Sequence, residues 1–300
     1  MSHSILYTQC PVCQAAQQRE VFAAKDYTVS NESFTILECP QCSLRYTQGI
    51  PDAAHIGPYY HSENYISHTN TSKGLVNRLY QAVRKRTIRS KVAMVKQVTG
   101  LDKGTHLDVG SGTGTFANAM REAGWQTTGL EPDPDARTMA KNLYGLELRE
   151  TAELYTLPEG SFDVITLWHV MEHVHDLHPY VQRMQQLLKP GGKLIVAVPN
   201  YTSKDAEIYG AYWAAYDVPR HLYHFSPASV RALVQQHGLE VKAYKPMWYD
   251  SFYISMLSNK YQKGSTGLIS AVWNGLRSNL KALSDVQRCS SVIYIIQNAK

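Results

Sequence analysis

A glycine-rich run and an acidic residue further along the chain have the types and spacing that could do chemistry. Asp108 opens the run that holds Gly110, Gly112 and Gly114, and Glu131 follows Gly110 by 21 residues. Glycine has no side chain, so the backbone can turn sharply into a helix and approach a flat ligand closely. A carboxylate at the end of the next strand can accept hydrogen bonds from both ribose hydroxyls. The pattern predicts a cradle for an adenosyl group.

The spacing of the glycines argues against a dinucleotide. The chain reads G-x-G-x-G and has Thr115 where the dinucleotide fingerprint G-x-G-x-x-G needs its last glycine. Asp108 would repel a pyrophosphate, whereas it would attract an ammonium or sulfonium group. A glycine loop alone is a weak signal, because nicotinamide enzymes use one too. Together with Asp108 and Glu131, it favours a ligand that joins adenosine to a cationic group.

Four of the five cysteines form two C-x-x-C pairs, Cys10 with Cys13 and Cys39 with Cys42. Each pair can present two thiolates to one ion, and two pairs complete the tetrahedron that Zn²⁺ prefers. Zinc is favoured over disulfides in a cytoplasmic chain. Four thiolates leave no open position, so we expect a structural zinc ion, with a degenerate ribbon as the alternative. Cys289 is interpreted as a small buried apolar side chain.

Histidine is the natural general base near neutral pH, and the candidates are His169, His173, His221 and His224. His221 follows the fifth predicted strand, where substrate-binding elements usually gather. His169 follows the fourth, and could act as base or only line the ligand pocket. His221 could equally be structural, and Glu172 with His173 could bind a metal or anchor a loop. An aromatic set could stack on an acceptor or simply pack: Tyr59, Tyr60, Tyr65, Tyr209, Trp213 and Tyr216.

An alternation of strands and helices positions these residues and predicts a doubly wound α/β sheet, mostly parallel with an antiparallel last strand. We predict strands at 105–109, 126–130, 146–148, 163–168, 193–198, 239–244 and 291–297. One predicted helix runs from Thr115 to Gly124, and another has Ser226 as its N-cap and Pro227 in its first turn. In such a sheet, ligands bind at the carboxyl ends of the strands.

The chain is predicted to consist of five parts. Residues 1–50 form a zinc ribbon, and residues 51–100 an aromatic lid followed by a helix. Residues 101–248 form the ligand-binding core, and residues 291–300 the closing strand. Residues 249–290 form a helical insertion that could cover the mouth of the site or make a homodimer contact.

The composition is that of an ordinary globular protein, with 44% hydrophobic and 18% charged residues among 300. No apolar stretch is long enough to span a membrane, and the N-terminus has no secretory pattern, so we expect a cytoplasmic location. The net charge is +5, and much of the excess lies in one predicted helix, at Arg84, Lys85, Arg86, Arg89, Lys91 and Lys96. Apolar residues recur there every three or four positions, so we expect the charges on a solvated face, with phosphate attraction as the alternative.

Five segments resemble class I S-adenosylmethionine-dependent methyltransferases, notably the branch similar to ubiquinone-type O-methyltransferases. They are Leu107 to Gly114, Gly129 to Pro132, Ser161 to Ile165, Val170 to Val174 and Leu187 to Gly192. The resemblance covers about residues 100–245, and it also extends to sugar-modifying enzymes that carry a zinc ribbon. It implies a Rossmann-like fold with S-adenosylmethionine as methyl donor, and it leaves the acceptor open.

The resemblance also implies roles for individual residues. Asp108 and the glycines would hold the methionine end of the donor, and Glu131 its ribose. Pro132 would line the adenine. The family often has an Asp-Ala pair that reads the adenine edge, whereas this chain has Thr151 and Ala152, so the backbone of Ala152 would serve instead. The residues expected to face the transferred methyl group are Trp168 and His169.

Three functions remain open at this point. The first is methyl transfer to a small molecule such as a sugar, nucleotide-sugar or related metabolite. The second is methylation of ribosomal RNA, although the ribbon carries few cations, namely Arg19, Lys25 and Arg45. The third is a non-catalytic scaffold with a vestigial donor pocket, which the intact glycine loop disfavours.

Overall fold

The computed structural model describes residues 3–60 and 75–299, and the side chains from residue 83 onward in the second range. Tyr65 therefore lies outside the described residues. Within the described ranges, no helix combines the length and the apolar character needed to cross a bilayer.

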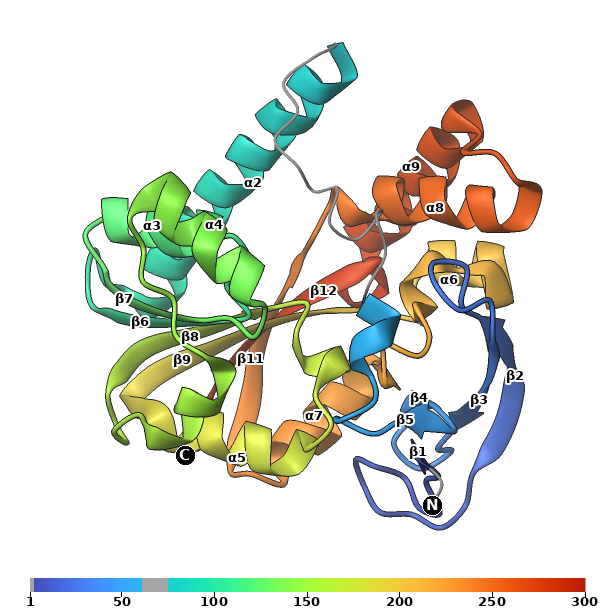
Figure 1. Ribbon diagram of the computed structural model, residues 1–300, viewed down its shortest axis with the longest axis horizontal. Helices are drawn as coiled ribbons and strands as arrows, with labels where there is room; N and C mark the ends of the chain where they lie inside the picture. The colour runs from blue at the N-terminus through green and yellow to red at the C-terminus, as the bar shows by residue number, and fades with distance from the viewer. Residues whose placement is uncertain (1–2, 61–74, 300) are drawn as a thin grey trace.

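A six-stranded sheet in the order β11-β12-β9-β8-β6-β7 forms the centre of the molecule (Figure 1). Its strands are β6 (Thr105–Val109), β7 (Gln126–Leu130), β8 (Phe162–Trp168), β9 (Leu188–Pro199), β11 (Leu239–Pro246) and β12 (Ser291–Asn298). β6, β7, β8 and β9 are parallel, while β12 is antiparallel to both its neighbours. This confirms the predicted doubly wound fold with an antiparallel last strand. The central strands are rich in Val, Ile and Leu because both faces of the sheet are covered.

The strand predicted at 146–148 is wrong. One isolated bridge, between Leu130 and Arg149, stands in its place at the edge of the sheet. The chain leaves α4 through Gly145 in a left-handed conformation and turns again at Thr151, so there is room for one bridged residue only. Leu146 packs against the helices beside the sheet. A short alternating run of apolar residues could not distinguish these two outcomes.

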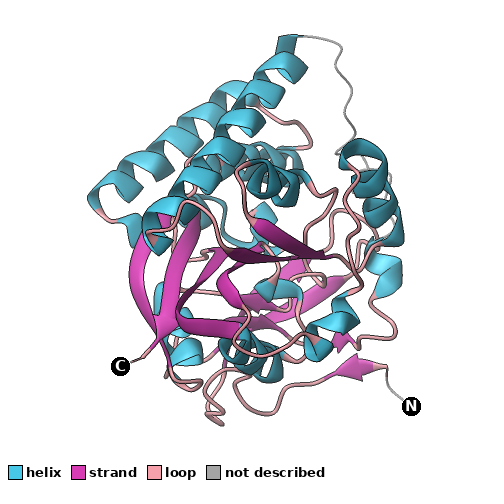
Figure 2. Ribbon diagram, turned by 90° about the vertical axis from the view of Figure 1, so that its left-hand side faces the viewer, coloured by secondary structure: helices cyan, strands magenta, loops and turns pink. Residues whose placement is uncertain are grey.

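Helices cover both faces of the sheet, as Figures 1 and 2 show. The principal ones are α2 (Leu75–Thr99), α3 (Thr115–Glu122), α4 (Pro134–Tyr144), α5 (Leu177–Leu187) and α7 (Pro227–Gln235). Side chains of α2 and α3 pack on one face, and those of α5 and α7 on the other. The predicted start of α7 is confirmed: Ser226 caps it, and Ser229 completes a capping box.

The N-terminal segment forms small sheets that include a strand from the core. β1 (Ser4–Ile5) pairs with β5 (Ile50–Pro51). The second sheet has the order β10-β4-β3-β2, built from β2 (Arg19–Lys25), β3 (Ser33–Glu38), β4 (Arg45–Thr47) and β10 (Tyr223–His224). Because β10 comes between β9 and β11 in the sequence, it ties the N-terminal segment to the chain around His221.

Two further helices occupy the region where the sequence predicts a helical insertion. α8 (Asp250–Lys263) and α9 (Leu268–Ser284) pack against each other and against the short α6 (Lys204–Tyr209). Short helical turns complete the chain: η1 (Gly57–Tyr60), η2 (Thr151–Thr156), η3 (Met171–His173), η4 (Gly210–Tyr212), η5 (Ala214–Tyr216) and η6 (Val286–Arg288).

Candidate active site

The glycine loop joins β6 to α3 and is left-handed at each of its three glycines. The φ angles of Gly110, Gly112 and Gly114 are 73°, 54° and 75°, a region that side chains with a Cβ rarely adopt. A Cβ on Gly110 would lie 2.4 Å from Val170, and one on Gly114 would lie 2.9 Å from Ala140. A Cβ on Gly112 would meet nothing within 4 Å. Packing therefore closes the two ends of the loop, and its middle is open to a ligand.

Glu131 follows β7 and lies directly against this loop. One carboxylate oxygen accepts a hydrogen bond from the Gly112 backbone at 2.7 Å, and the other accepts one from Asp133 at 3.0 Å. The side chain is buried, and burial raises its pKa. Each oxygen keeps a further acceptor position for a ligand hydroxyl. Pro132 and Ala152 are exposed nearby, at the ends of β7 and of the bridged segment.

Asp108 is buried near the carboxyl end of β6. The Thr166 hydroxyl donates to its carboxylate at 2.6 Å, and that hydroxyl also contacts the ring of the buried His106 at 2.9 Å. Burial raises the pKa of Asp108 to about 6, although Thr166 and the nearby Lys91 partly oppose the shift. Because Thr166 and Lys91 compensate only part of the cost of burying the Asp108 carboxylate, a cationic ligand group would stabilise its charged form.

Lys91 is a residue of this site that the sequence analysis placed on a solvated face. Its ammonium lies 3.8 Å from the centre of the Trp168 ring. Burial lowers the pKa of Lys91 to about 8, while Asp250 and Asp108 act in the opposite direction. The expectation was wrong for this lysine because α2 crosses the edge of the sheet where those carboxylates lie. Its spacing from Ile88 and Val95, one turn to either side on the apolar face, is a signal that could have identified it.

His169 follows β8 and lies between two carboxylates. One ring nitrogen is 3.3 Å from Glu172 Oε1, and the other is 3.1 Å from Asp250 Oδ2. Burial opposes protonation, but the two carboxylates outweigh it and raise the pKa of His169 to about 10. The imidazole is therefore a cation at neutral pH, and a cation has no lone pair with which to take a proton. This favours a positioning role over the role of a base.

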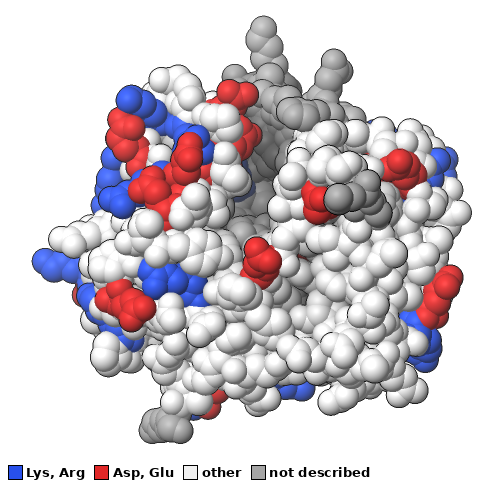
Figure 3. Space-filling view, turned by 60° about the horizontal axis from the view of Figure 1, so that its bottom comes forward, with Lys and Arg blue, Asp and Glu red and all other residues white. Residues whose placement is uncertain are grey.

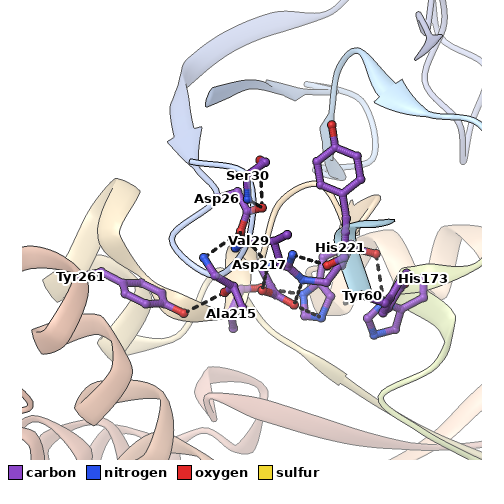
Figure 4. Close-up of polar contacts among 12 residues, drawn as sticks. Asp26, Val29, Ser30, Tyr60, His173, Ala215, Asp217, His221 and Tyr261 are labelled. Atoms are coloured by element: carbon purple, nitrogen blue, oxygen red, sulfur yellow. Dashed lines mark hydrogen bonds and ion pairs between the residues drawn. The ribbon is translucent and has the colours of Figure 1, made fainter. Parts of the chain in front are cut away.

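His221 lies in the loop before β10 and has a fixed orientation (Figure 4). Its Nδ1 donates to the backbone oxygen of Ala215 at 2.8 Å, so the neutral ring carries its lone pair on Nε2. Nε2 is 4.0 Å from Asp217. The His173 ring lies edge-on to the His221 ring at 4.6 Å, and its Nδ1 donates to the Arg220 carbonyl. These contacts fix the His221 ring and leave Nε2 as the ring nitrogen that is not bonded to a backbone carbonyl.

Glu172 lies between His169 and His221. Ligand atoms of Glu172, His173 and His221 lie within 4.8 Å of one another, and Glu172 also contacts His169. Its backbone carbonyl accepts a hydrogen bond from Leu222, which anchors the loop after β8. Its Oε2 is buried and has no hydrogen-bond partner among the described residues. The anchoring contact that the sequence suggests is therefore present, and a metal at this cluster stays a prediction.

Three of the six members of the predicted aromatic set are buried within the protein. Tyr209, Trp213 and Tyr216 are buried, and their polar atoms bond to Asn259, Asp205 and Arg45 respectively. His224 is also buried, contacts Thr47 at 3.0 Å and has a strongly lowered pKa because of its burial. These side chains support the wall around His221, whereas Tyr60 reaches His173 at 3.1 Å.

Arg220 binds the N-terminal segment to the wall of the site. Its guanidinium donates two hydrogen bonds to Asp217, one to Asp26 at 3.0 Å and one to the Tyr59 carbonyl at 2.8 Å. The side chain is fully buried. Sequence reasoning singled out the neighbouring His221, but it could not identify Asp26, which lies almost two hundred residues before Arg220 in the chain.

The four paired cysteines come together at the other end of the N-terminal segment. The sulfur atoms of Cys10 and Cys42, and those of Cys13 and Cys39, are 3.5 Å apart, and all four lie within 4.8 Å of one another. A tetrahedral zinc site, with Zn–S bonds of about 2.3 Å, requires sulfurs at about this separation. The cluster thus fits the donor set that the sequence predicts, and the fifth cysteine, Cys289, is not part of it and is buried as expected.

This combination of a doubly wound sheet, a left-handed glycine loop and a carboxylate on the loop backbone defines a nucleoside-binding α/β protein of the Rossmann-like class. The family model described as a methyltransferase domain matches residues 80–244, more than half of the chain. The chain therefore belongs to the methyltransferase domain family, and its fold is that of the S-adenosylmethionine-dependent members.

Two curated relatives share the name ubiquinone biosynthesis O-methyltransferase. The protein of Xanthomonas oryzae pv. oryzae (strain PXO99A) is 30% identical over 158 residues, which cover 48% of this chain and 66% of the relative. That of Bordetella avium (strain 197N) is 30% identical over 175 residues, which cover 53% of this chain and 72% of the relative. The match to the Xanthomonas protein thus spans slightly less than two thirds of its length.

A solved structure shares the fold over almost the whole chain. It is the Burkholderia thailandensis 1,6-didemethyltoxoflavin-N1-methyltransferase with bound 1,6-didemethyltoxoflavin and S-adenosylhomocysteine. The TM-score is 0.52 at 12% identity, and the match covers 92% of this chain and all of that one. This likeness supports the fold.

Proposed function

We propose that the protein transfers a methyl group from S-adenosylmethionine to a hydroxyl of a small molecule, such as a sugar, nucleotide-sugar or related metabolite. The observation that carries the proposal is the link through Glu172. This residue contacts His169 on the donor side, and its carboxylate lies within 4.8 Å of His221. The donor cradle and His221, which carries a lone pair on Nε2 when neutral, would thus form one continuous site.

The donor would bind along the carboxyl edge of the sheet. Glu131 would accept the ribose hydroxyls, and the open backbone at Gly112 would lie against the donor. Asp108 would stabilise its ammonium group, and Lys91 its carboxylate. Thr151 adds a contact that the sequence analysis discounted, because its buried hydroxyl has no partner among the described residues and could bind the adenine edge. Trp168 and His169 would bound the pocket near the methyl group.

The chain's own residues have two tasks in the reaction. They hold the acceptor oxygen in line with the methyl carbon, and they remove its proton. Nε2 of His221 would take the proton from the acceptor hydroxyl as the oxygen attacks the methyl carbon and the bond from carbon to sulfur breaks. His169, held as a cation by Glu172 and Asp250, would position the loop after β8. Both relatives are named ubiquinone biosynthesis O-methyltransferase, which supports oxygen as the methylated atom.

RNA as the acceptor has less support. RNA-binding surfaces carry stripes of basic side chains. The face in Figure 3 is hollowed between two lobes, and acidic and basic residues are interspersed on it. We therefore favour a small molecule. The scaffold alternative is disfavoured because the glycine loop, Asp108 and Glu131 are joined in an intact cradle.

Turnover of variants at His221 tests the proposed chemistry. With an alcohol as acceptor, His221→Asn should lower kcat by about 10²- to 10⁴-fold, because the amide cannot take the proton. With an acidic phenol that is already ionised at the assay pH, the same variant should show a far smaller fall in kcat. The exposed His3, changed to Asn, is the matched control and should leave turnover unchanged. Equal losses with both acceptors, or no loss with the alcohol, would remove His221 as the base.

We also propose that the four paired cysteines hold one structural zinc ion. Bound zinc would rigidify the segment that supplies β4, and with it the pairing with β10 beside His221. Metal analysis of the purified protein should return about one zinc per chain, and Cys39→Ser should lower both the zinc content and the melting temperature. Protein that is folded and free of zinc would contradict this assignment.

A further inference from the structure

α9 packs with its small residues inward and its large apolar residues outward. The buried positions are Ala271, Gly275, Ser278 and Ala282. A Cβ on Gly275 would lie 2.6 Å from Phe252 on α8, and the Ser278 hydroxyl donates to the buried Asp205 at 2.6 Å. The opposite side, here called the α9 face, consists of Leu268, Ile269, Val272, Trp273, Leu276, Leu280 and Leu283.

The α9 face is strongly exposed. Ile269 is 89% exposed, Trp273 63% and Leu283 71%. Single exposed apolar residues are common on proteins, but a continuous row of them along one helix marks an interaction surface. Trp248 and Tyr249 are also exposed, and Asn279 of α9 donates to the Trp248 carbonyl at 2.8 Å, so Trp248 lies beside the same helix.

From the second residue of α8 to the end of α9 every charged residue is basic; the acidic residues that flank this stretch in the sequence are Asp250 and the exposed Asp285. Residues 251–284 include no Asp or Glu and four cations, Lys260, Lys263, Arg277 and Lys281. A two-fold contact with a second copy would set this region against itself, so cations would meet cations. A surface of anionic headgroups offers the opposite charge over an apolar layer, which suits a helix with a basic border and Trp and Leu side chains.

We propose that the α9 face docks the protein onto an anionic membrane surface, with α9 lying in the plane of the interface. Within the described ranges no helix could span the bilayer, so the contact would be peripheral. The proposal goes beyond the proposed function and does not depend on it, because it rests on residues outside the donor and acceptor sites.

The contact would bring the candidate site near the lipid. α8 and α9 lie together at one end of the molecule, at the upper right of Figure 1. α8 begins at Asp250, whose carboxylate contacts His169. Ser251, in the first turn of α8, bonds to Asn279 of α9 at 3.1 Å, so roughly the diameter of one helix, about 10–12 Å, would separate a bilayer against α9 from this end of α8.

Co-sedimentation of the full chain with vesicles tests the proposal. Wild-type protein should bind vesicles of phosphatidylcholine mixed with phosphatidylglycerol at least about tenfold more tightly than vesicles of phosphatidylcholine alone, and high salt should weaken the binding. Ile269→Ser with Trp273→Ser should abolish it. Arg277→Gln and Lys281→Gln should each weaken it on the order of fivefold. Leu143→Ser with Tyr155→Ser, at exposed apolar residues elsewhere, is the matched control.

Three results would overturn the proposal. The first is the absence of any preference for the anionic vesicles. The second is binding that Ile269→Ser with Trp273→Ser leaves unchanged while its circular dichroism matches the wild type. The third is a wild-type dimer, seen by sedimentation velocity, that this variant dissociates although neither protein binds vesicles; the α9 face would then be a contact with a second copy.

Discussion

The charge of individual side chains in the site decides which residues can act on a donor and which on an acceptor. Lys91 lies over Trp168 and near Asp108, in a position to bind an anionic group. Lys91→Met should weaken binding of S-adenosylhomocysteine by roughly tenfold, because a hydrogen bond to a charged group is lost. Lys85→Met, at an exposed lysine of the same helix, should leave the affinity unchanged in calorimetry. Equal affinities of both variants would place Lys91 outside the donor site.

The contacts of His169 with two carboxylates predict that the stability of the protein depends on pH. Its pKa is about 10 in the folded protein against 6.5 for a free side chain. A cation with a raised pKa contributes stability that is fully present below pH 6.5 and is lost as the pH rises toward 10. His169→Gln lacks this contribution, so its deficit in melting temperature relative to wild type should be largest at about pH 6.5 and should shrink as the pH rises toward 10. A deficit that is independent of pH would contradict the ionised assignment.

At the scale of elements, two glycines of the loop have different roles. Gly114 is needed for packing, and Gly112 would be needed for binding the donor. Alanine in a left-handed conformation costs about 1–2 kcal/mol at either position. Gly114→Ala should cost more, roughly 2–3 kcal/mol, because its Cβ would also clash with Ala140. Gly112→Ala should lower the stability only by the conformational strain, yet it should lower the affinity for the donor more than Gly114→Ala does. Denaturant unfolding and calorimetry on both variants distinguish the two effects, and the reverse ranking of stabilities would contradict the packing of the loop.

The sequence predicts the elements that carry a local signal. The bounds of β6 and β7 agree with the prediction, and the capping residues of α7 mark its start because their chemistry is local. The isolated bridge at Arg149 was missed because residues 146–148 could either pair with the sheet or pack against the helices. Which of the two occurs is decided only in the assembled fold. Lys91 and Asp250 were missed for the same reason, since each acquires its partners from distant strands and helices.

At the scale of the whole molecule, Arg220 joins the N-terminal segment to the wall of the site. Removing this buried cation leaves Asp26 and Asp217 without their charged partner, so Arg220→Leu should cost about 3–5 kcal/mol in unfolding free energy. Arg19→Leu, at an exposed ion pair, should cost at most about 1 kcal/mol. Similar denaturant midpoints for the two variants would show that the segments are not coupled in this way.

The central claim is that the glycine loop and Glu131 bind the donor, and titration calorimetry with S-adenosylhomocysteine tests it most directly. Wild-type protein should bind one equivalent, and Glu131→Ala should lose this binding while it keeps a cooperative melting transition. Glu122→Ala, in the helix after the loop, is the matched control and should bind as wild type does. A wild-type protein that does not bind S-adenosylhomocysteine, or a Glu131→Ala variant that binds it equally well, would contradict the account.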